Sequence, residues 1–158
     1  MPRAFAAALV TCLVAAPLSA ERKLVEGQIA LSRFGLRYET VSAFQLREGN
    51  GYVPLRVPDG KRLTIRQVTA TCNLGGSSSL AMNFWTVRSS SDGTIHHYLP
   101  MTGTNAETGM VWVSNERVQI PVRAGDAPVA TFRRSLVYGY VTDGCIGSWT
   151  GYLEDAEP

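Results

Sequence analysis

Short clusters of turn-forming residues interrupt this sequence, and most of the strands predicted between them start about 8–12 residues apart, which limits the length of any regular element. Glycine, asparagine and aspartate tolerate a positive φ, and proline presets the first position of a turn. The clusters are Gly49-Asn50-Gly51, Pro58-Asp59-Gly60, Gly75-Gly76, Asp92-Gly93, Ala124-Gly125-Asp126 and Asp143-Gly144. Elements this short are typical of antiparallel β-proteins rather than of alternating strands and helices.

Between the turns, apolar and polar residues alternate with the period of a half-buried strand. In the clearest example Leu63 and Ile65 share one face. The opposite face then carries Arg62, Thr64 and Arg66. Further strands are predicted at Ser42–Arg47, Tyr52–Val57, Leu80–Val87, Thr94–Leu99, Met110–Ser114, Val118–Arg123, Pro128–Arg133, Leu136–Thr142 and Ser148–Leu153.

The strand that starts at Lys61 contains one break in its alternation. Val68, Ala70 and Cys72 continue the apolar pattern, but the step from Ile65 to Val68 changes parity by one residue. Such a break predicts a β-bulge at Arg66-Gln67, where the strand bends. The bulge places Cys72 on the inner face.

We predict an all-β fold, an antiparallel two-sheet sandwich of the jelly-roll or immunoglobulin-like kind, over residues 42–158. Leu24–Leu36 is the one stretch compatible with a helix, but Gly27 and Gly35 disfavour a helix there. Residues 21–41 are therefore assigned as an N-terminal extension whose structure the sequence leaves open.

The first 20 residues have the organisation of a cleaved secretory signal peptide. Arg3 precedes the uncharged stretch Ala4–Ala16, and Pro17-Leu18-Ser19-Ala20 supplies small residues before a cut after Ala20. A lipid anchor at Cys12 is the alternative, but Leu9-Val10-Thr11 lacks the small residue usual before such a cysteine. No other apolar run approaches the length of a transmembrane segment. We therefore expect a secreted or periplasmic protein.

Two cysteines, Cys72 and Cys145, remain after the predicted cleavage. An even number of cysteines in an exported chain favours a disulfide over a metal site. A redox-active cysteine pair typically has a Cys-x-x-Cys spacing or a neighbouring histidine or lysine, and the local sequence has neither. The predicted disulfide is structural.

The charge of the chain argues against a nucleic-acid partner. The sequence has 15 basic and 13 acidic residues, and removal of Arg3 with the signal peptide leaves 14 basic residues. A nearly neutral chain without a basic tract lacks the electrostatic surface that binds nucleic acid or an anionic membrane.

Two segments resemble those of small exported bacterial β-sandwich proteins of unassigned function. Val57-Pro58-Asp59-Gly60-Lys61-Arg62-Leu63-Thr64-Ile65 is similar to their Val-Pro-x-Gly-Lys-Arg-Leu-x-Ile strand start, and Gly151-Tyr152-Leu153-Glu154-Asp155 is similar to their final strand. The resemblance extends from about Ser42 to the end of the chain. It implies a β-sandwich fold and export, and it implies no catalytic residues.

Residues suited to catalysis or metal binding are few, and we predict no catalytic residue, no metal and no cofactor. His96 and His97 are adjacent, so on a strand they point to opposite faces and do not easily share a metal ion. A hydrolytic triad would have to combine Ser77–Ser79 and His97 with Asp92 or Asp143, without a nucleophile-elbow spacing.

Aromatic residues are the sequence feature that points most towards a function. Trp112, Trp149, Tyr140 and Tyr152 lie in predicted strands, where an exposed ring can stack on a sugar. The competing interpretation is core packing, because a tryptophan beside a disulfide is often buried in a sandwich.

We therefore predict an exported, non-catalytic binding or interaction module of the cell envelope or extracellular space, with a glycan or an envelope protein as its partner. A hydrolase with a loop-built site and a self-assembling structural subunit are the two alternatives.

Overall fold

The computed structural model describes residues 22–34, 39–75, 84–88, 96–106, 109–133 and 144–156. Within these ranges the chain forms strands and no helix, which confirms the all-β prediction. The strands are β1 (Lys23–Arg33), β2 (Glu39–Glu48), β3 (Gly51–Pro54), β4 (Lys61–Gly75), β5 (Phe84–Arg88), β6 (His96–Pro100), β7 (Thr102–Ala106), β8 (Gly109–Val122), β9 (Val129–Arg133) and β10 (Gly144–Asp155).

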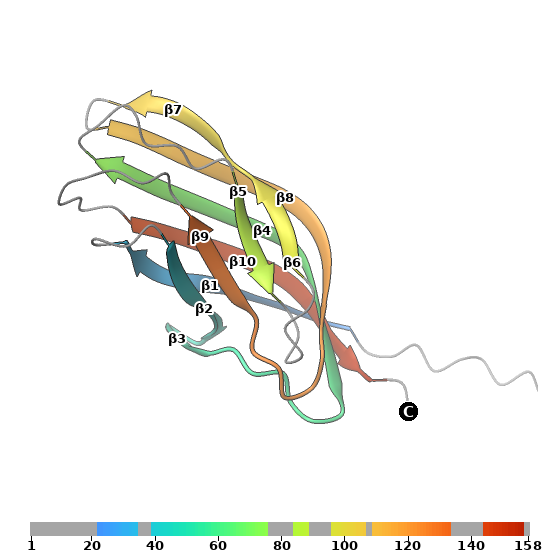
Figure 1. The fold of residues 1–158 in the computed structure, drawn as a ribbon. Coiled ribbons are helices and arrows are strands. Elements are labelled where there is room, and N and C mark those ends of the chain that lie inside the picture. The colour runs from blue at the N-terminus through green and yellow to red at the C-terminus, as the bar shows by residue number, and fades with distance from the viewer. Residues whose placement is uncertain are drawn as a thin grey trace, which may run out of the picture.

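The ten strands form one antiparallel sheet in the order β6-β5-β9-β2-β1-β10-β4-β8-β7, with β3 paired to β2. β2 connects the part of the sheet formed by β6, β5 and β9 to the part formed by β1, β10, β4, β8 and β7. Its residues 39–43 pair with β9, whereas residues 45–48 pair with β3. The sheet curls so that β9, β5 and β6 lie over the long strands β10, β4 and β8 (Figure 1). Its end strands β6 and β7 are separated in the chain only by Met101, so the sheet is nearly closed. The assignment to a two-sheet sandwich stays a prediction.

β4 contains the predicted bulge. Against β10 the register passes from Ile65 paired with Gly151 to Gln67 paired with Thr150, so Arg66 is the extra residue on β4. The register against β8 shifts at the same place, between Ile65 and Gln67. The bulge restores the inward direction for the apolar residues that follow, and Cys72 is fully buried as expected.

One strand prediction is wrong at β8. The two strands expected at Met110–Ser114 and Val118–Arg123 are a single strand. The polar residues between them, Asn115 to Arg117, continue the pairing with β4. They contain neither glycine nor proline, so nothing in the backbone ends the strand at this point.

Leu24–Leu36 is the stretch whose sequence is compatible with a helix, but the structure shows strand β1 over Lys23–Arg33. β1 lies inside the sheet, between β2 and β10. Gly27 of β1 is directly opposite Trp149 of β10. A Cβ atom at this glycine would lie 2.6 Å from Trp149 Nε1, so the bare backbone makes room for the indole, which donates a 3.0 Å hydrogen bond to the carbonyl oxygen of Gln45.

The inward side chains of both parts of the sheet form one hydrophobic core. Trp85 of β5 stacks on Phe132 of β9 with ring centroids 5.1 Å apart. The Cys72–Cys145 disulfide joins directly opposed residues of β4 and β10, and both cysteines are fully buried.

Two predicted segments lie outside the described residues, namely the signal peptide at residues 1–20 and the strand at Leu136–Thr142. No helix in the described part of the chain is long and apolar enough to cross a membrane.

Candidate functional site

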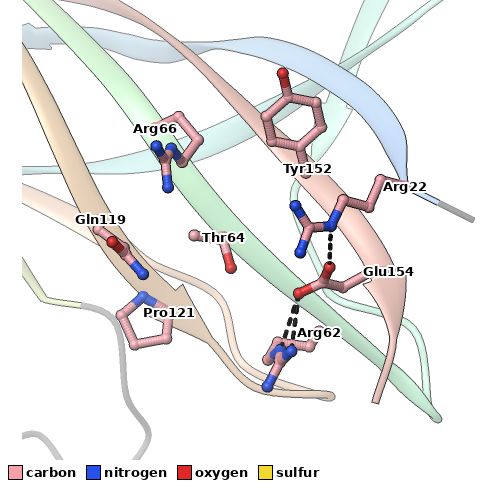
Figure 2. Close-up of a pocket in the computed structure, with 8 residues that line it drawn as sticks. All are labelled: Arg22, Arg62, Thr64, Arg66, Gln119, Pro121, Tyr152 and Glu154. Carbon is pink, nitrogen blue, oxygen red and sulfur yellow. Dashed lines mark hydrogen bonds and ion pairs between the residues drawn. The ribbon is translucent and has the colours of Figure 1, made fainter. Parts of the chain in front are cut away.

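The outer face of the sheet carries a polar pocket with a volume of about 600 Å³ (Figure 2). Thr64 of β4 pairs with Tyr152 of β10 on one side and with Pro121 of β8 on the other. Outward positions of three adjacent strands therefore meet here, joined by a residue that precedes β1. The lining residues are Arg22, Arg62, Thr64, Arg66, Gln119, Pro121, Tyr152 and Glu154.

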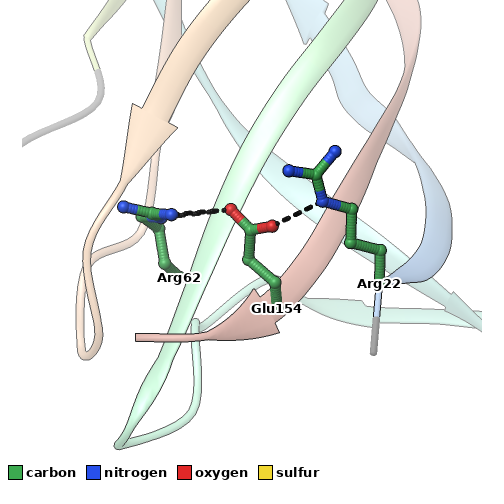
Figure 3. A network of polar contacts seen from close by, with 3 residues as sticks. All are labelled: Arg22, Arg62 and Glu154. Carbon is green, nitrogen blue, oxygen red and sulfur yellow. Dashed lines mark hydrogen bonds and ion pairs between the residues drawn. The ribbon is translucent and has the colours of Figure 1, made fainter. Parts of the chain in front are cut away.

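Glu154 holds two of the arginines in place (Figure 3). Arg22 donates from Nε to Glu154 Oε2 over 2.9 Å. Arg62 donates to Oε1 from Nε over 3.2 Å and from Nη2 over 2.9 Å. The Glu154 side chain is only 10% exposed, whereas the two arginine side chains are 71% and 45% exposed. The carboxylate thus lies beneath the guanidinium groups and orients them.

The same contacts keep Glu154 ionised. The hydrogen bond from Arg62 lowers the pKa of the Glu154 carboxyl, and the positive charge of Arg22 acts in the same direction. Burial raises this pKa and is a larger influence than the charge of Arg22, but the contacts with the two arginines together outweigh it. Because the net shift is downward, the carboxylate retains its charge at neutral pH and both ion pairs persist.

Several arginine donors remain available at the pocket. In the part of the chain that the structure describes, the Arg66 side chain has no hydrogen bond or ion pair. Neither terminal nitrogen of Arg22 has a described partner, since Nε makes its contact with Glu154. The pocket contains three arginines and one glutamate, so its net charge is +2.

This arrangement is suited to binding an anion. Guanidinium groups donate strong, directional hydrogen bonds to carboxylate, sulfate and phosphate oxygens. The hydroxyl of Thr64, which lies among the arginines, and the amide of Gln119 on β8 add neutral polar groups (Figure 2). No histidine or cysteine is among the described lining residues.

The structure describes three of the four predicted aromatic residues and places them in different environments. Tyr152 lies at the pocket and is 40% exposed. Trp149 is 1% exposed in the core, with its ring centroid 6.1 Å from that of Phe44. Trp112 is half-buried opposite Cys72, on the inner face of the sheet. Tyr140 lies outside the described residues. Of the described three, only Tyr152 therefore offers its ring on the outer face to a ligand at this site.

The two adjacent histidines of β6 differ in exposure, with His96 exposed and His97 half-buried. Desolvation by burial lowers the pKa of His97, and its Nε2 has no hydrogen-bond partner among the described residues. The serines and aspartates of the alternative hydrolytic triad, Ser77–Ser79, Asp92 and Asp143, lie outside the described residues. The described residues contain no group of three or more side chains able to hold a metal ion.

Comparison with known proteins identifies no family. No family model matches the chain, and no curated protein matches it. A chain of a solved structure described as the asymmetric unit of the cyanophage Pam1 capsid is 14% identical, with 98% of this chain and 99% of that chain covered and a TM-score of 0.48. A similarity this distant carries no functional conclusion.

Proposed function

We propose that this chain is an exported, non-catalytic β-sandwich module that binds an acidic glycan on the outer face of β4, β8 and β10. The observation that carries the proposal is the guanidinium of Arg66, which has no partner among the described residues and lies beside two arginines that Glu154 holds in place. Because Arg22 and Arg62 are already oriented, an incoming anion loses less of its binding energy to ordering side chains.

Three further features support a glycan as the ligand. The ring of Tyr152 lies at the pocket beside the arginines, where it can stack on a sugar while the guanidinium groups bind its acidic substituent. The pocket volume, about 600 Å³, is in the range of small-molecule sites. The disulfide is compatible with an oxidising compartment, where envelope and extracellular glycans occur.

Replacing Arg66 tests this proposal. We expect the Arg66→Gln variant to bind acidic polysaccharides at least about tenfold more weakly than the original protein, because one charge-assisted hydrogen bond is worth about 1.5–3 kcal/mol. Biolayer interferometry against a panel of acidic and neutral cell-envelope polysaccharides measures the effect. The matched control is Arg88→Gln, which removes the same charge from an exposed position on β5. Equal binding of neutral and acidic polymers, or an equal loss in both variants, would contradict the proposal.

A specific feature of β7 favours self-assembly as a second candidate function. β7 is an end strand that pairs only with β8 in the described sheet. Its sequence, Thr102-Gly103-Thr104-Asn105-Ala106, contains no charged residue or proline to discourage pairing with another chain. A second copy can therefore add a strand at this edge.

If β7 mediates assembly, sedimentation velocity will detect larger species as the protein concentration rises. We expect the Thr104→Lys variant to remain monomeric, because an edge lysine opposes strand addition. Thr71→Lys provides the control, since Thr71 is an exposed position on the interior strand β4. A protein that is monomeric at millimolar concentration would exclude this second function.

A further inference from the structure

We infer that the pocket recognises a sulfate or phosphate monoester carried by a sugar, in preference to a sugar carboxylate. This inference rests on the proposed function, since it specifies the chemical group that the arginines bind. The two esters share the relevant chemistry, a tetrahedral group with three terminal oxygens.

The directions of the free donors distinguish these esters from a carboxylate. Arg22 approaches from the segment before β1, while Arg62 and Arg66 approach from β4 on either side of Thr64 (Figure 2). A carboxylate is planar and presents two oxygens, so one or two guanidinium groups on its edges satisfy it. A tetrahedral ester directs its three terminal oxygens to different sides and can accept hydrogen bonds from all three arginines together.

Glu154 already shows how a carboxylate fits among these side chains. It uses both oxygens on Arg22 and Arg62, and Arg66 is not included. A second carboxylate from a ligand would lie near this buried one and would leave donors unused. A group with three acceptor oxygens and a charge of −1 to −2 instead uses Arg66 as well and offsets the net charge of +2.

The test compares dextran polymers that differ only in their acidic group. Dextran sulfate, phosphorylated dextran and carboxymethyl dextran are matched for substitution per sugar, and unmodified dextran is the neutral reference. The purified protein, with its disulfide intact, is titrated with each polymer at physiological ionic strength, because salt screens exposed charges. The two ester polymers separate phosphate recognition from sulfate recognition.

We expect at least one ester polymer to bind about tenfold more tightly than carboxymethyl dextran, which corresponds to one additional charge-assisted hydrogen bond. In the Arg66→Gln variant the ester polymer and carboxymethyl dextran are expected to bind with nearly equal affinity, whereas the Arg88→Gln variant keeps the preference for the ester. Equal or tighter binding of carboxymethyl dextran, still dependent on Arg66, would overturn the ester inference and leave the proposed acidic-glycan site standing. Absence of binding to every charged polymer, or binding that does not change in Arg66→Gln, would overturn both.

Discussion

Reduction of the Cys72–Cys145 disulfide is expected to lower the free energy of unfolding by about 4 kcal/mol. The bond closes a loop across a sequence separation of 73 residues, and the chain-entropy model gives this magnitude for a loop of that length. A typical domain has a total stability of about 5–15 kcal/mol, so the reduced protein loses a large share of it. Urea unfolding of the oxidised and reduced forms measures the difference as a shift of the transition midpoint.

The double variant Cys72→Ala/Cys145→Ala separates the cross-link from the packing of the sulfur atoms. Reduction keeps both buried sulfurs, whereas the alanine variant removes them from the core and is expected to be less stable than the reduced protein. If the oxidised and reduced forms unfold at the same urea concentration, the disulfide does not stabilise the fold.

The Gly27→Ala substitution is expected to destabilise the protein by about 3 kcal/mol. The added methyl group would overlap the carbonyl oxygen of Gln45 and approach Trp149 Nε1, so β1 must move away from both neighbouring strands. Overpacking costs about 1–3 kcal/mol, and loss of the buried Trp149–Gln45 hydrogen bond costs about another 1–3 kcal/mol. Thermal unfolding followed by circular dichroism measures the combined effect.

Gly51→Ala is the matched control for this substitution. Gly51 is also a strand glycine, but it is exposed and a Cβ atom there has no neighbour closer than 4.0 Å. We expect a change within about 0.5 kcal/mol. Equal stability of the Gly27 and Gly51 variants would mean that β1 and β2 separate without cost and that the close packing around Trp149 is unimportant.

Part of the candidate site follows from the sequence pattern. Alternation along one strand places Arg62, Thr64 and Arg66 on its polar face, and all three line the pocket. The same pattern cannot identify the residues that complete the site. Glu154 lies 92 positions from Arg62 and 132 positions from Arg22, and only the pairing of β10 with both β4 and β1 brings these side chains together.

The aromatic residues illustrate the same limit at β10. Ile146 and Tyr152 lie on one face of this strand, while Cys145 and Trp149 lie on the other. Because both faces carry large apolar side chains, alternation alone does not indicate which face is inside. The indole of Trp149 fits into the core because the residue opposite it is a glycine. This glycine belongs to β1, a segment whose sequence is also compatible with a helix.

The all-β class, the bulge in β4 and the cysteine pair were predictable from the sequence, because each depends on local periodicity, turn residues or composition. Only the folded structure shows the strand order, the position of β1 inside the sheet and the presence of three arginines and Glu154 in one pocket. The physical reason is that strand pairing joins residues through backbone hydrogen bonds, which every residue except proline can both donate and accept. The choice of neighbouring strand therefore depends on how the whole core packs rather than on any short stretch of sequence.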